Sequence, residues 1–373
     1  MAQKSEELKA QGINIVNMSV GEPDFDTPEH IKAAATAAIE ANWSKYSPVS
    51  GYKSLKEAAC GKLLRENGLE FSPSQIVVSN GAKQSICNAV LALVNPGDEV
   101  IIPAPFWVSY PQMVKLAQGI PVSPEATIES QYKISPEQLE AAITPRTKLL
   151  ILCSPCNPSG AVYSRSELEA LAEVVLRHEG LYVISDEIYE HINYVGEHAS
   201  IAAVPGMRER TMVVNGVSKA YAMTGWRIGY IAAPQWIADA CNMLQGQYTS
   251  GPCSVSQKAA EAALNGPQEC VELMRQSFQR RRDLIVRLMR GIPGLEVNEP
   301  EGAFYLFPRC SAYLGGRFKT ATELAMYLLE TGHVATVGGD AFGAPGCLRL
   351  SYATSEENII EAAARIKRAL ETL

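Results

Sequence analysis

The chain has 373 residues, of which 47% are hydrophobic and 20% are charged, and its formal net charge is −7 at pH 7. This length favours two domains, because a single hydrophobic core rarely serves more than about 250–300 residues. The acidic balance argues against binding of nucleic acid, which needs a basic surface. The longest apolar runs are too short to span a bilayer, and the N-terminal segment lacks the apolar stretch of a secretion signal. We therefore predict a cytoplasmic protein that binds neither nucleic acid nor membranes.

From about residue 75 the sequence alternates short runs of β-forming apolar residues with longer helical patterns. The apolar runs, each predicted to be a strand, occupy residues 75–80, 98–104, 147–154, 180–187, 211–216 and 227–233. Several are apolar on both faces, as in strands that helices cover on each side. Residues 83–94 and 164–178 show the helical spacing of apolar side chains. This alternation predicts an α/β fold with three layers, a mainly parallel sheet between two layers of helices.

The stretch after residue 265 has fewer strand patterns. It contains a long charged helical segment at 270–291, a short apolar run at 301–308 and a closing segment at 347–373. We predict that residues 28–265 form a large α/β domain. Residues 1–27 and 266–373 are predicted to form a smaller α+β domain.

Nine cysteines in a chain without a secretion signal favour free thiols over disulfides. Cys153 and Cys156 have the C-x-x-C spacing of some redox and zinc sites. The turn sequence that follows them does not fit a thioredoxin-like helix start, and the five histidines are scattered singly. We interpret both residues as buried thiols at the end of a strand, and we predict no metal site.

The residues that follow the predicted strands are the candidates for function, because ligands of open α/β sheets bind beyond the carboxyl ends of the strands. Gly81, Ala82 and Lys83 lie between a strand and a helix, where free backbone N–H groups suit a phosphate. Arg227 could hold the same phosphate with two hydrogen bonds. Taken alone, Gly81 is more typical of a tight turn. Arg227, taken alone, is more typical of a surface residue or an ion pair.

Asp186 ends a predicted buried strand, where an ionised carboxylate needs a partner. The protonated nitrogen of a pyridine ring is one such partner. Alternatively, Asp186 and Glu187 could bind a metal together, or Asp186 could be the N-cap of a following helix. Tyr189 and Asn157 could reach an oxygen of the same ring, although the tyrosine also suits packing and an Asn before Pro suits a turn. Lys219 follows another strand, and a lysine amine forms a Schiff base with an aldehyde. Together these groups point to pyridoxal phosphate as the cofactor.

Six segments carry a resemblance to a known enzyme family: residues 79–85, 103–111, 153–160, 184–192, 215–230 and 349–358. In their order and spacing, the whole chain resembles a class I pyridoxal-phosphate-dependent aminotransferase of fold type I. It is most similar to the prokaryotic-type aspartate aminotransferases, a group that includes aspartate/prephenate aminotransferases.

The resemblance implies a role for each candidate residue. Lys219, Asp186 and Tyr189 are the expected catalytic residues: Lys219 carries the cofactor and moves the proton at the substrate Cα, and Asp186 pairs with the ring nitrogen. Tyr189 and Asn157 would bond the phenolic oxygen of the cofactor, and Trp107 would stack on its ring. The other groups expected to bind the cofactor, chiefly its phosphate, are Gly81, Ala82, Lys83, Ser218, Arg227 and Tyr46, the last from the other subunit of a homodimer.

The resemblance also implies a substrate site. Arg349 would bind the α-carboxylate of the amino acid with two hydrogen bonds, assisted by Asn157, Trp107 and the backbone of Gly21. Lys83 is our candidate for the second carboxylate of an acidic substrate, although a solvated lysine at a helix start is an equally good interpretation.

The expected activity is reversible ping-pong transamination between L-aspartate and 2-oxoglutarate. The alternatives are transamination of prephenate or of aromatic amino acids and, within the same fold, a pyridoxal-phosphate-dependent lyase. A binding or regulatory protein without catalysis is disfavoured, because Lys219 is intact.

Overall fold

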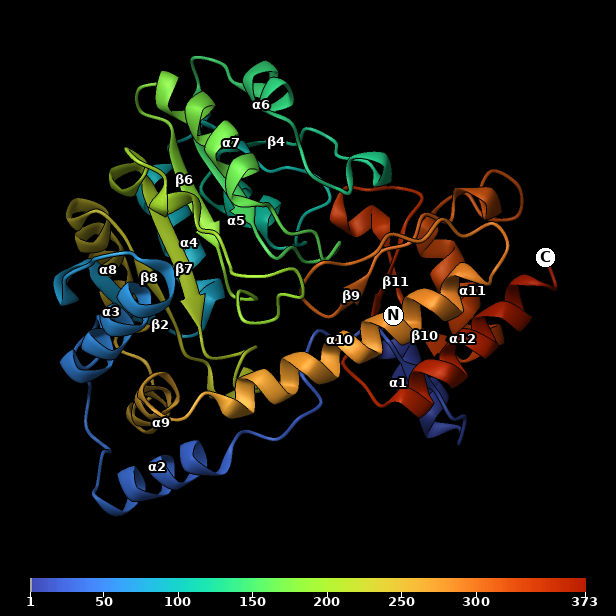
Figure 1. Ribbon diagram of the computed structural model, residues 1–373, viewed down its shortest axis with the longest axis horizontal. Helices are drawn as coiled ribbons and strands as arrows, with labels where there is room; N and C mark the ends of the chain where they lie inside the picture. Colours follow the sequence, from blue (N-terminus) through green and yellow to red (C-terminus); the bar gives the residue numbers. More distant parts are fainter. Residues whose placement is uncertain (1) are drawn as a thin grey trace.

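The computed structural model describes residues 2–373 and has a seven-stranded sheet at the centre of its larger part (Figure 1). In spatial order the strands are β2 (Ile76–Ser79), β8 (Gly229–Ala232), β7 (Thr211–Gly216), β6 (Tyr182–Asp186), β5 (Thr147–Cys153), β3 (Glu99–Ile101) and β4 (Ile120–Val122). Neighbours from β7 to β4 pair in parallel, whereas β8 runs antiparallel to both β2 and β7. The sheet is therefore mainly parallel, as predicted. The short edge strand β4 was not predicted from the sequence.

Helices cover both faces of this sheet, because successive strand residues point to opposite sides. The helices that pack on one face are α4 (Ala82–Leu93), α5 (Tyr110–Leu116) and α8 (Gln235–Tyr248). The helices on the other face are α6 (Pro136–Ala142), α7 (Arg165–Arg177), α3 (Lys53–Asn67) and α9 (Ser254–Asn265), and α2 (Glu29–Glu40) packs on α9. None of the helices within residues 2–373 combines the length and apolarity needed to cross a membrane.

The smaller part of the molecule is built from both ends of the chain (Figure 1). In its sheets, β1 (Val16–Asn17) pairs with β10 (Val334–Ala335), and β12 (Leu348–Ser351) lies between β11 (Val337–Gly338) and β9 (Tyr305–Leu306). Its helices are α1 (Ala2–Ala10), α10 (Glu269–Arg290), α11 (Ala321–Gly332) and α12 (Glu356–Leu370). Because residues from β1 and from α10 to α12 share one apolar core, we propose domains of residues 28–265 and of residues 1–27 with 266–373.

The core of the smaller part continues into the larger part at the end of β6. Ile188, Tyr189 and Ile192 follow β6 and belong to the same apolar cluster as Phe304 and Leu350. The ring centroids of Tyr189 and Phe304 are 5.5 Å apart. The residues that follow β6 therefore lie where the two parts meet.

The first residue of β8, Gly229, lies close to the start of α4. A Cβ at Gly229 would overlap the backbone of Gly81 and Ala82, so only glycine fits at this point of β8. Gly81 has a φ of 81°, which favours glycine, and a Cβ there would overlap the guanidinium of Arg227. These two glycines bring Arg227 against the first turn of α4.

Candidate active site

A cavity of about 690 Å³ lies at the carboxyl ends of β5, β6 and β7. The predicted site residues that line it are Gly21, Ala82, Lys83, Trp107, Asn157, Asp186, Tyr189, Ser218, Lys219, Arg227 and Arg349. Of the two others, Gly81 contacts the Arg227 guanidinium and Tyr46 lies elsewhere on the surface. The structure therefore brings together most of the residues that the sequence singled out.

One end of the cavity offers hydrogen-bond donors to an anion. Helix α4 begins at Ala82, after the Gly81 turn, and the first N–H groups of a helix have no partners within the helix. Arg227 donates to the carbonyl oxygens of Asn80 (3.2 Å) and Thr224 (2.9 Å), which orient its guanidinium. This set of donors fits a phosphate group.

Asp186 is the last residue of β6, and its side chain is buried. Its Oδ2 accepts a hydrogen bond from the Tyr110 hydroxyl (2.5 Å), and its Oδ1 accepts one from the Ile188 N–H (3.3 Å). Burial raises the pKa of this carboxyl to about 6, and the two hydrogen bonds oppose the rise. The attraction of Lys219 also lowers this pKa, but less than either hydrogen bond does. An ionised Asp186 would therefore be stabilised by a cation in the cavity.

Lys219 follows β7 and faces the same cavity. Its Nζ donates a hydrogen bond to the carbonyl oxygen of Gly21 (2.7 Å). Burial lowers the pKa of Lys219 to about 8; the charge of Glu22 opposes this shift, and the charges of Arg349 and Arg227 add to it. An amine with a pKa near neutrality can act both as a nucleophile and as a general base.

Arg349 in β12 presents a buried guanidinium to the cavity. Its Nη1 donates to Asn157 Oδ1 (3.0 Å), and its Nη2 donates to the Ser19 carbonyl oxygen (2.7 Å). The guanidinium lies 4.6 Å from the ring centroid of Tyr305 and 4.9 Å from that of Phe342. Its buried Nε has no hydrogen-bond partner in the part of the chain that the structure describes. A ligand carboxylate would satisfy this donor.

Tyr189 lies three residues after Asp186 and is also buried. Its hydroxyl is 2.7 Å from the hydroxyl of Tyr305. Burial raises the pKa of Tyr189 well above its usual range, and the contact with Tyr305 raises it further. The phenol therefore stays protonated at neutral pH and can donate a hydrogen bond.

The two alternatives for Asp186 do not match the structure. Residues 188–191 form a turn instead of a helix, so Asp186 is not a helix N-cap. The side chain of Glu187 is not directed to the cavity. It accepts hydrogen bonds from Ser185 (2.8 Å) and Ser200 (2.6 Å), and it lies 3.0 Å from His198 Nε2. Asp186 and Glu187 therefore do not form a pair of metal ligands.

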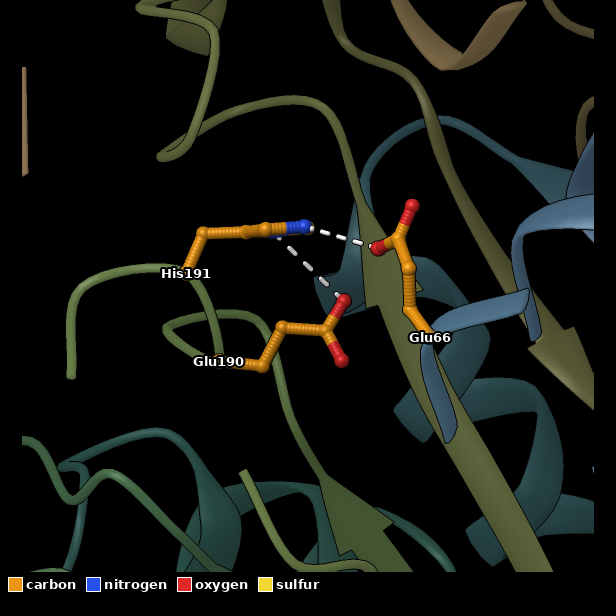
Figure 2. Close-up of side chains that lie close together, drawn as sticks. All are labelled: Glu66, Glu190 and His191. Atoms are coloured by element: carbon orange, nitrogen blue, oxygen red, sulfur yellow. Dashed lines mark hydrogen bonds and ion pairs between the residues drawn. The ribbon is translucent and has the colours of Figure 1, made fainter. Parts of the chain in front are cut away.

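Glu66, Glu190 and His191 form a second titratable cluster, outside the cavity (Figure 2). His191 Nε2 lies 2.9 Å from Glu66 Oε2, and its Nδ1 lies 3.6 Å from Glu190 Oε1. The carboxylate of Glu190 is also paired with the ammonium of Lys62 and accepts a hydrogen bond from the amide of Asn215 (2.7 Å). This arrangement favours a network of ion pairs over a metal site. The absence of a metal stays a prediction.

The nine cysteines are all free thiols. Cys153 at the end of β5 and Cys156 in the following loop are buried, in agreement with the interpretation of their spacing. Contact with Cys156 and burial raise the pKa of the Cys153 thiol, so this thiol stays protonated at neutral pH.

Tyr46 and Lys83 are the least enclosed of the predicted residues. Tyr46 is 98% exposed and does not line the cavity, so its expected contact with a phosphate stays a prediction. Lys83 is exposed at the second position of α4, and its Nζ lies 4.8 Å from the ring centroid of Trp107. The ring of Trp107 in turn meets that of Tyr110 edge-on, with centroids 5.4 Å apart. The Lys83 ammonium is thus close to Trp107 at the cavity.

Glu22, Tyr110, Tyr305 and Phe342 are among the residues that line the cavity and were not predicted as site residues from the sequence. Glu22 directly follows Gly21, and Tyr110 lies three residues after Trp107, so their position beside predicted residues was the available signal. Tyr305 and Phe342 come from the smaller part of the molecule, where apolar runs are typical of an ordinary core.

The family model for aminotransferase class I and II matches residues 13–366. With the sheet and the cavity described above, this match establishes that the chain belongs to the class I and II aminotransferases. The predicted family is therefore confirmed, and the protein is an aminotransferase.

Several characterised proteins are similar to this chain over nearly its full length. An aspartate/prephenate aminotransferase from Cereibacter sphaeroides is 50% identical over 98% of this chain and 94% of that protein. A bifunctional aspartate aminotransferase and glutamate/aspartate-prephenate aminotransferase from Petunia hybrida is 50% identical over 98% of this chain and 78% of its own length. The crystal structure of the aspartate aminotransferase from Rhizobium meliloti matches with a TM-score of 0.96 at 46% identity, covering 99% of this chain and 94% of that one. This similarity confirms the predicted fold class.

The Asp186→Asn substitution tests the burial of this carboxyl in the cofactor-free protein. The folded-state pKa of about 6 exceeds the ordinary value of 3.8, so the folded protein binds the proton more tightly. The tighter binding of this proton stabilises the folded protein at low pH, and the stabilisation is lost as the pH rises from about 4 to 6. We expect the Asp186→Asn protein to gain up to about 3 kcal/mol relative to wild type across this window. Urea unfolding of both proteins at the two ends of the window measures the gain, and a difference that does not change with pH would contradict it.

Proposed function

We propose that the protein is an aspartate aminotransferase, which transfers the amino group of L-aspartate to 2-oxoglutarate with pyridoxal phosphate as its cofactor. The observation that carries the proposal is the meeting of three groups in one cavity: the buried amine of Lys219, the buried carboxyl of Asp186 and the unpartnered Nε of Arg349. The names of the similar proteins support aspartate as a substrate.

The donors and acceptors of the cavity fit pyridoxal phosphate. Arg227 and the N–H groups of Ala82 and Lys83 would hold the phosphate, in a cradle that a side chain at Gly81 would fill. Asp186 would face the ring nitrogen, because the positive charge of that nitrogen compensates the burial of the carboxylate. Both ends of the cofactor thus meet groups of complementary charge.

The remaining contacts would fix the plane and the phenolic oxygen of the cofactor. Tyr189 and Asn157 would donate to the oxygen, Trp107 would stack on the ring, and Ser218 would add a donor to the phosphate. Tyr110 supports this arrangement, because its ring contacts Trp107 and its hydroxyl donates to Asp186.

When bound, pyridoxal phosphate takes up the amino group of the substrate and draws electrons from its Cα. Lys219 carries out the proton transfer: its amine accepts the proton from Cα and later returns it. Desolvation makes this amine a weaker base than an exposed lysine, with a pKa of about 8, so the returned proton is not held too tightly. The carbonyl of Gly21, which accepts a hydrogen bond from Nζ, holds the ammonium form in place.

Arg349 would orient the substrate by its α-carboxylate. The hydrogen bonds to Asn157 and to the Ser19 carbonyl prevent the guanidinium from rotating freely. A carboxylate oxygen that reaches its Nε would satisfy a buried donor that has no partner among the described residues. Because the bound carboxylate fixes the position of the neighbouring Cα–H, this contact would bring the proton to Lys219.

An acidic substrate brings a second carboxylate, for which Lys83 is our candidate. Its ammonium lies at the cavity beside Trp107. A lysine is a point charge without the two-pronged geometry of arginine, so it discriminates less strictly among carboxylates. Prephenate is therefore the second candidate substrate, and the names of the Cereibacter and Petunia proteins support it.

We also propose a homodimer in which Tyr46 of each chain reaches the phosphate site of the other. The supporting observation is the 98% exposure of Tyr46, because a tyrosine gains from burial at an interface. The cytoplasmic location stays a prediction from the sequence.

A spectral titration tests the proposed function. The protein is loaded with pyridoxal phosphate and mixed first with L-aspartate and then with 2-oxoglutarate. We expect aspartate to replace the absorption band of the bound aldehyde form with that of pyridoxamine phosphate, and 2-oxoglutarate to restore it. A bound cofactor that aspartate leaves unchanged would overturn the substrate assignment while keeping the cofactor. The Lys219→Ala protein is the control and should complete neither half-reaction.

The Lys83→Ala substitution tests the second carboxylate site. We expect kcat/KM for L-aspartate to fall about 10- to 100-fold, because a charge-assisted hydrogen bond is lost, while L-alanine changes by less than about threefold. The Lys115→Ala protein is the matched control, since this exposed lysine in the last turn of α5 does not line the cavity. Equal losses of kcat/KM for L-aspartate and L-alanine would contradict the assignment of Lys83 to the second carboxylate.

A further inference from the structure

Tyr305, the first residue of β9, contacts three parts of the candidate active site. Its hydroxyl lies 2.7 Å from the Tyr189 hydroxyl. The Arg349 guanidinium lies over its ring, 4.6 Å from the centroid. A Cβ on Gly21 would lie 2.5 Å from the Tyr305 hydroxyl, so this hydroxyl also requires a glycine at position 21. The side chain itself is 1% exposed and has a fixed environment.

We propose that Tyr305 is a positioning residue for transamination, a role that rests on the proposed function. It orients the Tyr189 hydroxyl through a hydrogen bond and the Arg349 guanidinium through its ring. Tyr305 therefore orients both Tyr189, the proposed donor to the phenolic oxygen of the cofactor, and Arg349, the proposed ligand of the substrate α-carboxylate.

The direction of the hydrogen bond follows from the number of protons. Each phenol has one O–H, and either hydroxyl can donate in this geometry. Tyr189 gives its proton to the phenolic oxygen in the proposed function, so Tyr305 must donate to Tyr189. A hydroxyl that accepts one hydrogen bond becomes a stronger donor of another.

The charges around Tyr305 support this direction. Burial raises the pKa of Tyr305, and the positive charge of Arg349 opposes the rise, which makes the hydroxyl a better donor. The other titratable groups that act on Tyr305 are Tyr189, Cys153 and Glu22. Of these groups, Tyr189 is the one that forms a hydrogen bond with it.

The ring of Tyr305 acts on the other half of the site. Tyr305 and Phe342 both lie against the guanidinium of Arg349, with centroids 4.6 and 4.9 Å away. Contacts with ring faces leave the N–H edge of a guanidinium free for hydrogen bonds. The two rings therefore help to fix the plane of this guanidinium, whose buried Nε has no hydrogen-bond partner among the described residues.

The Tyr305→Phe protein separates the two roles, because it loses the hydroxyl and keeps the ring. The readout is the pH midpoint of the visible absorption band of the bound cofactor, which reports the proton shared with its phenolic oxygen. Weaker donation by Tyr189 leaves more negative charge on that oxygen, so we expect the midpoint to rise by about 0.3–1 pH unit. The KM for aspartate should stay within about twofold of wild type, since the ring beside Arg349 remains.

The Tyr305→Leu protein loses the ring as well. We expect the same shift of the midpoint together with a rise of about 3- to 10-fold in the KM for aspartate. The Phe342→Leu protein is the matched control, because it removes the other ring beside Arg349 and no hydroxyl. Its KM should rise while its midpoint stays at the wild-type value.

A Tyr189→Phe background shows whether the effect passes through Tyr189. In that background Tyr305→Phe should add no further shift of the midpoint. An unchanged midpoint in the Tyr305→Phe protein, or a shift that persists without the Tyr189 hydroxyl, would overturn the proposal. Failure of the proposed function looks different, because the wild-type protein would then bind no pyridoxal phosphate or would show no conversion by aspartate.

Discussion

The whole site depends on the burial of a carboxyl and an amine at the same edge of the sheet. Asp186 is the last residue of β6, and Lys219 follows the neighbouring strand β7. Burial moves both pKa values toward neutrality, to about 6 for Asp186 and about 8 for Lys219. The charged form of each group is therefore costly without a partner. A ligand that brings a cation to Asp186 and an aldehyde to Lys219 would satisfy both groups at once.

The fold satisfies this constraint by bringing together groups that are far apart in the sequence. The parallel pairing of β6 and β7 places their carboxyl ends at one edge. Gly229 lets β8 approach the first turn of α4 closely, where the Arg227 guanidinium lies beside Gly81. The smaller part of the molecule adds the Gly21 carbonyl, which binds Lys219, and the guanidinium of Arg349. The cavity is thus shared by both parts of the chain.

Most of the sheet, and most of the residues that line the cavity, could be predicted from where they occur along the chain. The residues that were missed depend on contacts between distant parts of the sequence. Asp186 and Lys219 each follow a strand-like apolar run and have distinctive chemistry, so both could be placed at the cavity. Tyr305 has no such signal, because an aromatic residue in an apolar run is typical of a core and its hydroxyl partner is 116 residues away. The role proposed for Tyr46 involves a second chain, which no local pattern describes. The strand β4 has only three residues, none of them fully buried.

The central claim is that the buried Asp186 pairs with a cation, which the ring nitrogen of the cofactor supplies. The most direct test is nitrogen-15 NMR of the protein loaded with pyridoxal phosphate that is labelled at the ring nitrogen. We expect a protonated ring nitrogen at neutral pH in the wild-type protein and an unprotonated one in the Asp186→Asn protein. An unprotonated nitrogen in the wild-type protein would contradict the claim.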